Sequence, residues 1–124
     1  MSYIEDELCK IIDKHVRTED VALLKGDEDI VVDNLSELIQ ERAIVGEKKY
    51  KTTMARMDLY ERDWVQHSLE EGLDFLVYKL KLRSINPEDW WWLQVSKSGI
   101  IPTMVNHVIK LQRILLDMDA DNRA

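Results

Sequence analysis

Apolar residues recur along this chain with the spacing of α-helices rather than with the strict alternation of β-strands. Ile4, Leu8 and Ile11 share one helical face near the N-terminus, and Val108, Leu111 and Leu115 do so near the C-terminus. The 124 residues include only four glycines and two prolines, which leaves few turns between short strands. The pattern predicts an all-α protein, a helical bundle of four main helices plus a short one.

Capping boxes mark where three of these helices should begin. In such a box a polar residue is followed three positions later by an acid that completes its hydrogen bonds. The candidates are Ser2 with Glu5, Asn34 with Glu37, and Asp58 with Glu61. The helices predicted after them run to about His15, from residue 34 to Tyr50, and over residues 59–83. Gly46 should weaken or end the second of these helices.

The C-terminal third carries its own start and stop signals. Residues 86–89 read Asn-Pro-Glu-Asp, which predicts an asparagine cap, a proline at the first helical position and acids in the first turn. The short helix that follows holds Trp90, Trp91 and Trp92 and should stop at Gly99. Pro102 should begin the last helix, and the tail from Asp119 should fray.

Length and composition favour one domain over residues 1–124, large enough to bury a core without disulfides. We expect an N-terminal helix and loop over 1–33, a central helix pair over 34–83, and C-terminal helices over 86–118. The net charge of −7 disfavours nucleic acid and anionic lipid as partners unless a basic patch is present. The single cysteine, Cys9, cannot form an internal disulfide. With no visible signal peptide and no apolar stretch of about 20 residues, we expect a cytoplasmic protein.

The segment from Trp64 to Leu82 has an unusual distribution of acids. A broad apolar face and a narrower apolar strip are predicted on nearly opposite sides of this helix. The face consists of Val65, Leu69, Leu73, Leu76, Val77 and Leu80, and the strip of Trp64, Phe75 and Leu82. Between them lies a polar ribbon of His67, Glu70, Glu71 and Asp74, bordered by Tyr78. A surface helix normally has a single apolar face.

Carboxylates between apolar groups are costly unless they are paired, hydrogen-bonded or bound to metal. Glu71 and Asp74 lie one helical turn apart and point the same way. Their hard oxygen ligands suit Mg²⁺, with Mn²⁺ as a possible substitute. The alternative is that Glu-Glu-x-x-Asp is a solvated polar ribbon.

These residues also resemble a known family, the MazG-like all-α nucleoside triphosphate pyrophosphohydrolases, and most of all its short bacterial and bacteriophage members. The similarity covers roughly residues 35–82. The matching positions are Glu41-Arg42, Gly46, Lys48-Lys49-Tyr50, Thr52-Thr53, Asp63-Trp64, His67, Glu70-Glu71, Asp74 and Tyr78. The resemblance implies a helical bundle, usually a homo-oligomer (dimer or tetramer), in which acids from two neighbouring helices hold Mg²⁺. The central pair over residues 34–83 would then be the metal-binding helix pair.

Carried over residue by residue, the resemblance assigns Glu71 and Asp74 to the second acidic pair and Glu70 to the acid before it. The family's usual Glu-x-x-Glu on the preceding helix is absent, and Glu37 and Glu41 stand there instead. These two also share one helical face. Glu37 has a structural alternative as the capping acid of Asn34. Glu41, Glu71 and Asp74 are the predicted catalytic residues, and all five acids are predicted metal ligands.

Several neighbouring side chains are candidates for binding the triphosphate. A basic cluster is formed by Lys48, Lys49, Lys51 and Arg56, which can bind phosphate oxygens; solvated loop residues are the alternative. Relatives tend to have glycine where Lys51 stands. His67, Tyr50 and Tyr78 are further substrate-binding candidates, each with a packing role as its alternative. One of the three consecutive tryptophans can stack on a base, but because they point in different directions, packing in the core or in a subunit interface is favoured for one or two of them.

The predicted function is Mg²⁺-dependent hydrolysis of a nucleoside triphosphate to the monophosphate and pyrophosphate, with metal-activated water as the nucleophile. No phosphate-binding glycine loop, serine–histidine–aspartate order or paired-cysteine site competes with this interpretation. The alternative function is a non-catalytic module derived from the same fold, which binds nucleotide or another protein. A nucleotide sensor without hydrolysis is a third possibility.

Overall fold

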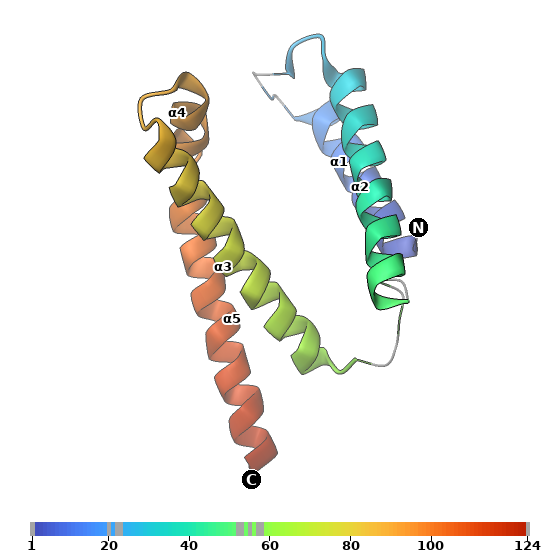
Figure 1. Cartoon of the computed structure of the whole chain (residues 1–124), viewed down its shortest axis with the longest axis vertical. Coiled ribbons are helices and arrows are strands. Elements are labelled where there is room, and N and C mark those ends of the chain that lie inside the picture. Colours follow the sequence, from blue (N-terminus) through green and yellow to red (C-terminus); the bar gives the residue numbers. More distant parts are fainter. Residues whose placement is uncertain are drawn as a thin grey trace. The chain divides into compact units, whose positions relative to one another are not determined.

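The computed structural model describes residues 2–19, 21, 24–51, 54, 56 and 59–123, with no side-chain description for Tyr50, Trp91, Asn122 and Arg123. Over these residues the chain forms five helices and no strand, which confirms the all-α prediction. The helices are α1 (Tyr3–Thr18), α2 (Glu28–Tyr50), α3 (Glu61–Ile85), α4 (Trp90–Lys97) and α5 (Ile100–Arg123) (Figure 1). In the described part, none of them has the length and apolar character that crossing a membrane requires.

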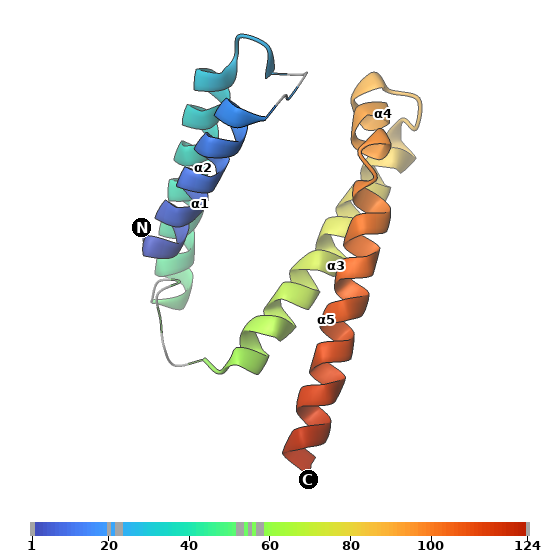
Figure 2. The ribbon, with the colours of Figure 1, turned by 180° about the vertical axis from the view of Figure 1, so that it is seen from behind.

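The chain divides into two compact units, Met1–Asp58 and Leu59–Ala124. The boundary falls inside the central segment 34–83 that the sequence predicts as a metal-binding helix pair, so α2 belongs to the first unit and α3 to the second. Within the units, α2 packs on α1, and α3 packs on α5. Each unit is therefore built around an antiparallel pair of helices (Figures 1 and 2).

The start of α1 confirms the first predicted capping box. The backbone N–H of Ile4 donates to Ser2 Oγ at 3.3 Å, and the N–H of Ser2 donates to Glu5 Oε2 at 3.2 Å. The Ser2 hydroxyl also hydrogen-bonds the Glu5 carboxylate. The helix continues to Thr18, slightly beyond the predicted end near His15.

The start predicted for the second helix is wrong, because α2 begins at Glu28 and not after Asn34. Turn hydrogen bonds after residue 21 already direct the chain into the helix, and Asp27 is its N-cap without a side-chain cap bond. Asn34 and Gly46 therefore lie inside a continuous helix. Their weak local preferences cost at most about 1 kcal/mol each, which does not interrupt a helix that has already been nucleated. Val16 of α1 and Val32 of α2 are buried, and Arg17 joins the helices through a 2.6 Å ion pair to Asp29.

Helix α3 begins two residues later than predicted. Helix α3 starts at Glu61 rather than Leu59, and the carboxylate of Asp63 accepts the N–H of Tyr60 at 3.0 Å. The acid three residues after the cap is thus Asp63. The predicted capping box was Asp58 with Glu61, and Asp58 lies outside the described residues. The helix ends at Ile85, two residues beyond the predicted Arg83.

The predicted boundaries of the last two helices also need correction. Helix α4 starts at Trp90, not Pro87, because the Asn86 side chain accepts the N–H of Glu88 in a separate turn. The stop at Gly99 is confirmed: its φ of +71° is a conformation that glycine adopts without strain. Helix α5 starts at Ile100 with Pro102 in its first turn, where a missing N–H costs nothing.

The core of the second unit is the contact between α3 and α5. Its buried residues are Leu69, Val108 and Leu115, with Val65, Leu76, Met104 and Leu111 packed around them. Gly72 is buried at the same contact. Only part of the predicted apolar face of α3 is used, since Leu73, Val77 and Leu80 are exposed. A single partner helix covers a narrower strip than the face the sequence provides.

Candidate functional site

The acids of the predicted polar ribbon lie on the middle turns of α3. Glu70, Glu71 and Asp74 are all exposed. The Gln66 amide donates to Glu70 at 3.3 Å, whereas no hydrogen bond or ion pair engages Glu71 or Asp74 among the described residues. These two carboxylates are accessible to a ligand from solvent, which differs from the buried setting that the two apolar strips led us to expect.

The flanking groups of the ribbon are arranged by local contacts. The His67 ring lies 6.0 Å from the ring of Trp64, between centroids, and tilted by 59°. The Lys79 ammonium lies 4.8 Å over the Phe75 ring, a cation–π distance. Tyr78 is exposed one turn after Asp74. His67 is itself exposed and its aromatic neighbour belongs to the same helix, so among the described residues it is not packed between helices.

The acids expected to complete the metal site lie on α2. Glu37 and Glu41 are exposed and share one helical side. Because α2 begins at Glu28, Glu37 stands well inside the helix. The alternative role of Glu37 as the capping acid of Asn34 is therefore wrong, and its carboxylate has no part in the helix start.

Carboxylate oxygens are the donors that Mg²⁺ prefers, so the predicted set fits the ion in chemical kind. Glu37 and Glu41 belong to the first unit, and Glu70, Glu71 and Asp74 to the second. Over the described residues, no group of three or more histidine, cysteine, aspartate or glutamate side chains is gathered closely enough to hold a metal ion. Within its own unit, α2 carries two of the predicted ligands, and α3 carries three.

The predicted phosphate-binding residues follow the end of α2. Lys48 and Lys49 are exposed in its last turn, where cations also favour the helix dipole. Arg56 is partly buried. The side chain of Tyr50 lies outside the described residues. Lys48 and Lys49 are therefore exposed, with helix-end stabilisation as an additional role.

Lys51 is the C-cap of α2 and has a left-handed conformation, with φ 57° and ψ 30°. Its N–H donates to the Glu47 carbonyl at 2.7 Å, which closes the last turn. Glycine is the usual residue in this conformation, because a β-carbon strains it. The backbone at Lys51 thus adopts the conformation that a glycine would favour. The lysine side chain raises the energy of this conformation but does not change the path of the chain.

An ion pair that the sequence did not predict joins the start of α3 to the end of α5. The Arg62 guanidinium donates to both carboxylate oxygens of Asp119, at 2.7 and 3.1 Å. These hydrogen bonds, together with the charge of Asp119, raise the pKa of Arg62. The predicted fraying from Asp119 is wrong, since α5 continues to Arg123. No local pattern connects two residues so far apart in the chain.

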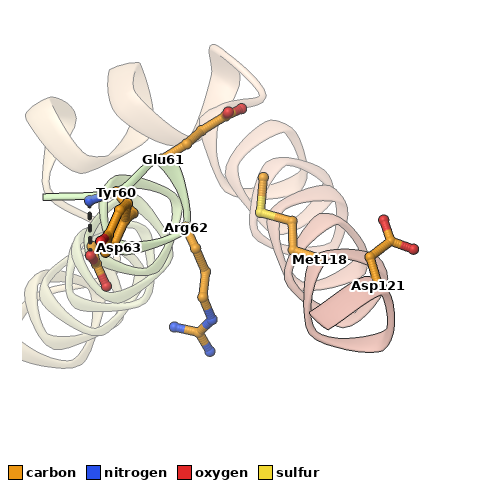
Figure 3. Close-up of a pocket in the computed structure, with 6 residues that line it drawn as sticks. All are labelled: Tyr60, Glu61, Arg62, Asp63, Met118 and Asp121. Atoms are coloured by element: carbon orange, nitrogen blue, oxygen red, sulfur yellow. Dashed lines mark hydrogen bonds between the residues drawn. The ribbon is translucent and has the colours of Figure 1, made fainter. Parts of the chain in front are cut away.

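Beside this ion pair lies an open hollow of about 570 Å³. It is lined by Tyr60, Glu61, Arg62, Asp63, Met118 and Asp121 (Figure 3). Three of the six are acids and Arg62 is already engaged by Asp119. None of the predicted site residues is among the residues that line the hollow.

Comparison of the chain with protein-family models, with curated proteins and with solved structures finds no match.

Proposed function

We propose that this protein is a Mg²⁺-dependent nucleoside triphosphate pyrophosphohydrolase, which converts a nucleoside or deoxynucleoside triphosphate and water to the monophosphate and pyrophosphate. The observation that carries the proposal is the pair Glu71 and Asp74, exposed one turn apart on α3. The resemblance of residues 35–82 to the MazG-like family supports the same reaction. The same resemblance names Glu37, Glu41 and Glu70 as further metal ligands.

Phosphoryl transfer is catalysed mainly by positioning and charge neutralisation, so the protein needs few reactive groups of its own. When bound, Mg²⁺ would offset the charge of the triphosphate and lower the pKa of water in its coordination shell. The carboxylates of Glu71 and Asp74 would hold the ion at α3. Lys48 and Lys49 are exposed and carry the charge that binds phosphate oxygens.

The direct test incubates the full chain with a panel of canonical and modified nucleoside triphosphates and Mg²⁺, and measures pyrophosphate together with the matching monophosphate. Glu71→Gln keeps the size of the side chain and removes its charge, so we expect activity to fall by at least about a hundredfold. Glu7→Gln, the same change at an exposed position of α1, is the matched control and should retain activity. Wild-type turnover in Glu71→Gln would contradict the metal assignment.

A second candidate is a non-catalytic module that binds nucleotide or another protein. It is favoured by one observation: over the described residues no three candidate ligands are gathered. If no nucleotide of the panel is hydrolysed with either Mg²⁺ or Mn²⁺, and a nucleotide nevertheless raises the melting temperature, the protein binds nucleotide without hydrolysing it.

A further inference from the structure

Met104 lies in the first turns of α5, where this helix comes close to Gly72 of α3. A β-carbon at position 72 would lie 3.5 Å from Met104 Sδ, a van der Waals distance, and would already overlap Val108. The Met104 side chain also packs against the buried cluster of Leu69, Val108 and Leu115. Its thioether is therefore part of the apolar contact between α3 and α5.

Although Met104 belongs to this contact, its side chain is only partly buried. The other two methionines in the described part of the chain have different surroundings. Met54 is exposed, and Met118 is partly buried beside the open hollow. Neither is among the residues packed around Leu69. Within the described residues, Met104 is thus the methionine that combines a place in the apolar contact with partial access from solvent.

The sulfur of Met104 is an atom that a peroxide can modify. Hydrogen peroxide transfers one oxygen to a thioether: the O–O bond breaks, an S–O bond forms, the sulfur is oxidised by two electrons and water is released. The resulting sulfoxide is polar and one atom larger. Its oxygen is costly among aliphatic side chains such as Leu69 and Leu76 unless it is hydrogen-bonded. The side chain can avoid this cost by turning towards solvent, but α3 then loses the packing that Met104 provides.

We infer that Met104 is an oxidation-sensitive site, and that its conversion to the sulfoxide by a peroxide loosens the contact between α3 and α5. A sulfoxide that stays inside disturbs the packed residues, and one that turns out leaves a gap beside Gly72. Methionine sulfoxide is reduced back to methionine by dedicated reductases, so the change is reversible. The contact lies wholly within the second unit, and α1 and α2 keep their own packing. The inference does not rest on the proposed hydrolysis.

The test treats the full chain with hydrogen peroxide for increasing times. Peptide mass spectrometry gives the oxidised fraction of each methionine, and circular dichroism gives the melting temperature of the same samples. We expect the melting temperature to fall by about 5 °C as Met104 becomes oxidised, and a methionine sulfoxide reductase should restore it. Amide hydrogen exchange should become faster in α3 and α5 around Gly72 and stay the same in α1 and α2.

Met104→Leu separates this site from the other oxidisable groups, because leucine has a similar volume and contains no sulfur. Peroxide should leave the melting temperature of this variant unchanged, although Cys9 and the other methionines are still present. Met118→Leu is the matched control, and it should lose as much stability on oxidation as the wild type does.

If Met104→Leu is itself unstable, the time courses of the wild type decide. Its melting temperature should then follow the oxidation of Met104, and not that of Met54 or Met118. Three results would overturn the inference: Met104 resists peroxide in the folded protein, its complete oxidation leaves the melting temperature unchanged, or Met104→Leu loses as much stability on oxidation as the wild type.

Discussion

Gly72 of α3 and Val108 of α5 approach each other so closely that a β-carbon at position 72 would lie 2.6 Å from Cγ1 of Val108. Valine is stiff about χ1, so it cannot turn this methyl group away without cost. The close contact explains a glycine in the middle of a long helix, where it otherwise lowers stability.

Gly72→Ala should therefore destabilise the protein. Overpacking costs about 1–3 kcal/mol, and the gain in helix propensity offsets about 1 kcal/mol of it. We expect a net loss of about 1 kcal/mol in urea denaturation. Val108→Ala removes the opposing methyl groups, so Gly72→Ala should cost less in that background.

Gly46→Ala is the matched control for this prediction. Gly46 also lies inside a helix, but a β-carbon there meets no atom of the described side chains within 4 Å. The substitution should stabilise the protein by about 0.5–1 kcal/mol, through propensity alone. If both glycine variants changed stability in the same direction, the close contact at Gly72 would not be the cause.

The left-handed conformation at Lys51 leads to a second prediction. Lys51→Gly removes the β-carbon that strains this conformation and should stabilise the protein by about 0.5–1 kcal/mol, after the greater freedom of glycine in the unfolded chain is counted. Lys51→Ala keeps the β-carbon and should leave the unfolding free energy close to that of wild type. Thermal and urea unfolding of both variants measure the difference, and equal stability of the two would argue against a left-handed cap.

The ion pair of Arg62 with Asp119 holds the end of α5 against the start of α3. Asp119→Asn should loosen the last turn of α5 while the global stability changes little, because both side chains are partly exposed. Amide hydrogen exchange should become severalfold faster after residue 116, and remain unchanged around the buried Leu69. High salt should reduce the difference between wild type and variant. Uniformly faster exchange along α5 would show that the pair supports the whole helix contact.

Metal binding provides a prediction that does not depend on turnover. Mg²⁺ should raise the melting temperature of the wild type, since a ligand bound only by the folded state stabilises it. Glu71→Gln should lose most of this shift, and Glu7→Gln should keep it. An equal shift in all three proteins would indicate general screening of the acidic chain instead of a site on α3.

Structural features whose residues lie close together in the sequence were predicted better than features that depend on distant residues. Ser2 and Glu5 were recognised as a capping box because the whole motif lies within four residues. Asn34 with Glu37 offered the same pattern, yet the helix had already begun at Glu28 and, once nucleated, it continued through both residues. A polar pair inside a helix and a polar pair at its start look alike when only local sequence is considered.

The same reasoning applies to the candidate site. The sequence placed Glu71 and Asp74 on one helix and on one side of it, because helical periodicity alone decides this. Whether that side is exposed, and whether further ligands lie close to it, depends on which helices pack nearby. Helical periodicity does not determine this packing. The pair Arg62–Asp119 lay beyond prediction for the same reason: its partners come from opposite ends of a unit.

The division after residue 58 has a consequence for how the chain is made. Helices α1 and α2 pack on each other and follow each other directly along the chain, and α5 packs on α3 after the short α4. Contacts between near neighbours in sequence close short loops, which is typical of rapid folding. All of the residues that pair α1 with α2 are synthesised before α3. The first unit can therefore begin to form its contacts during translation, while the second is still being added.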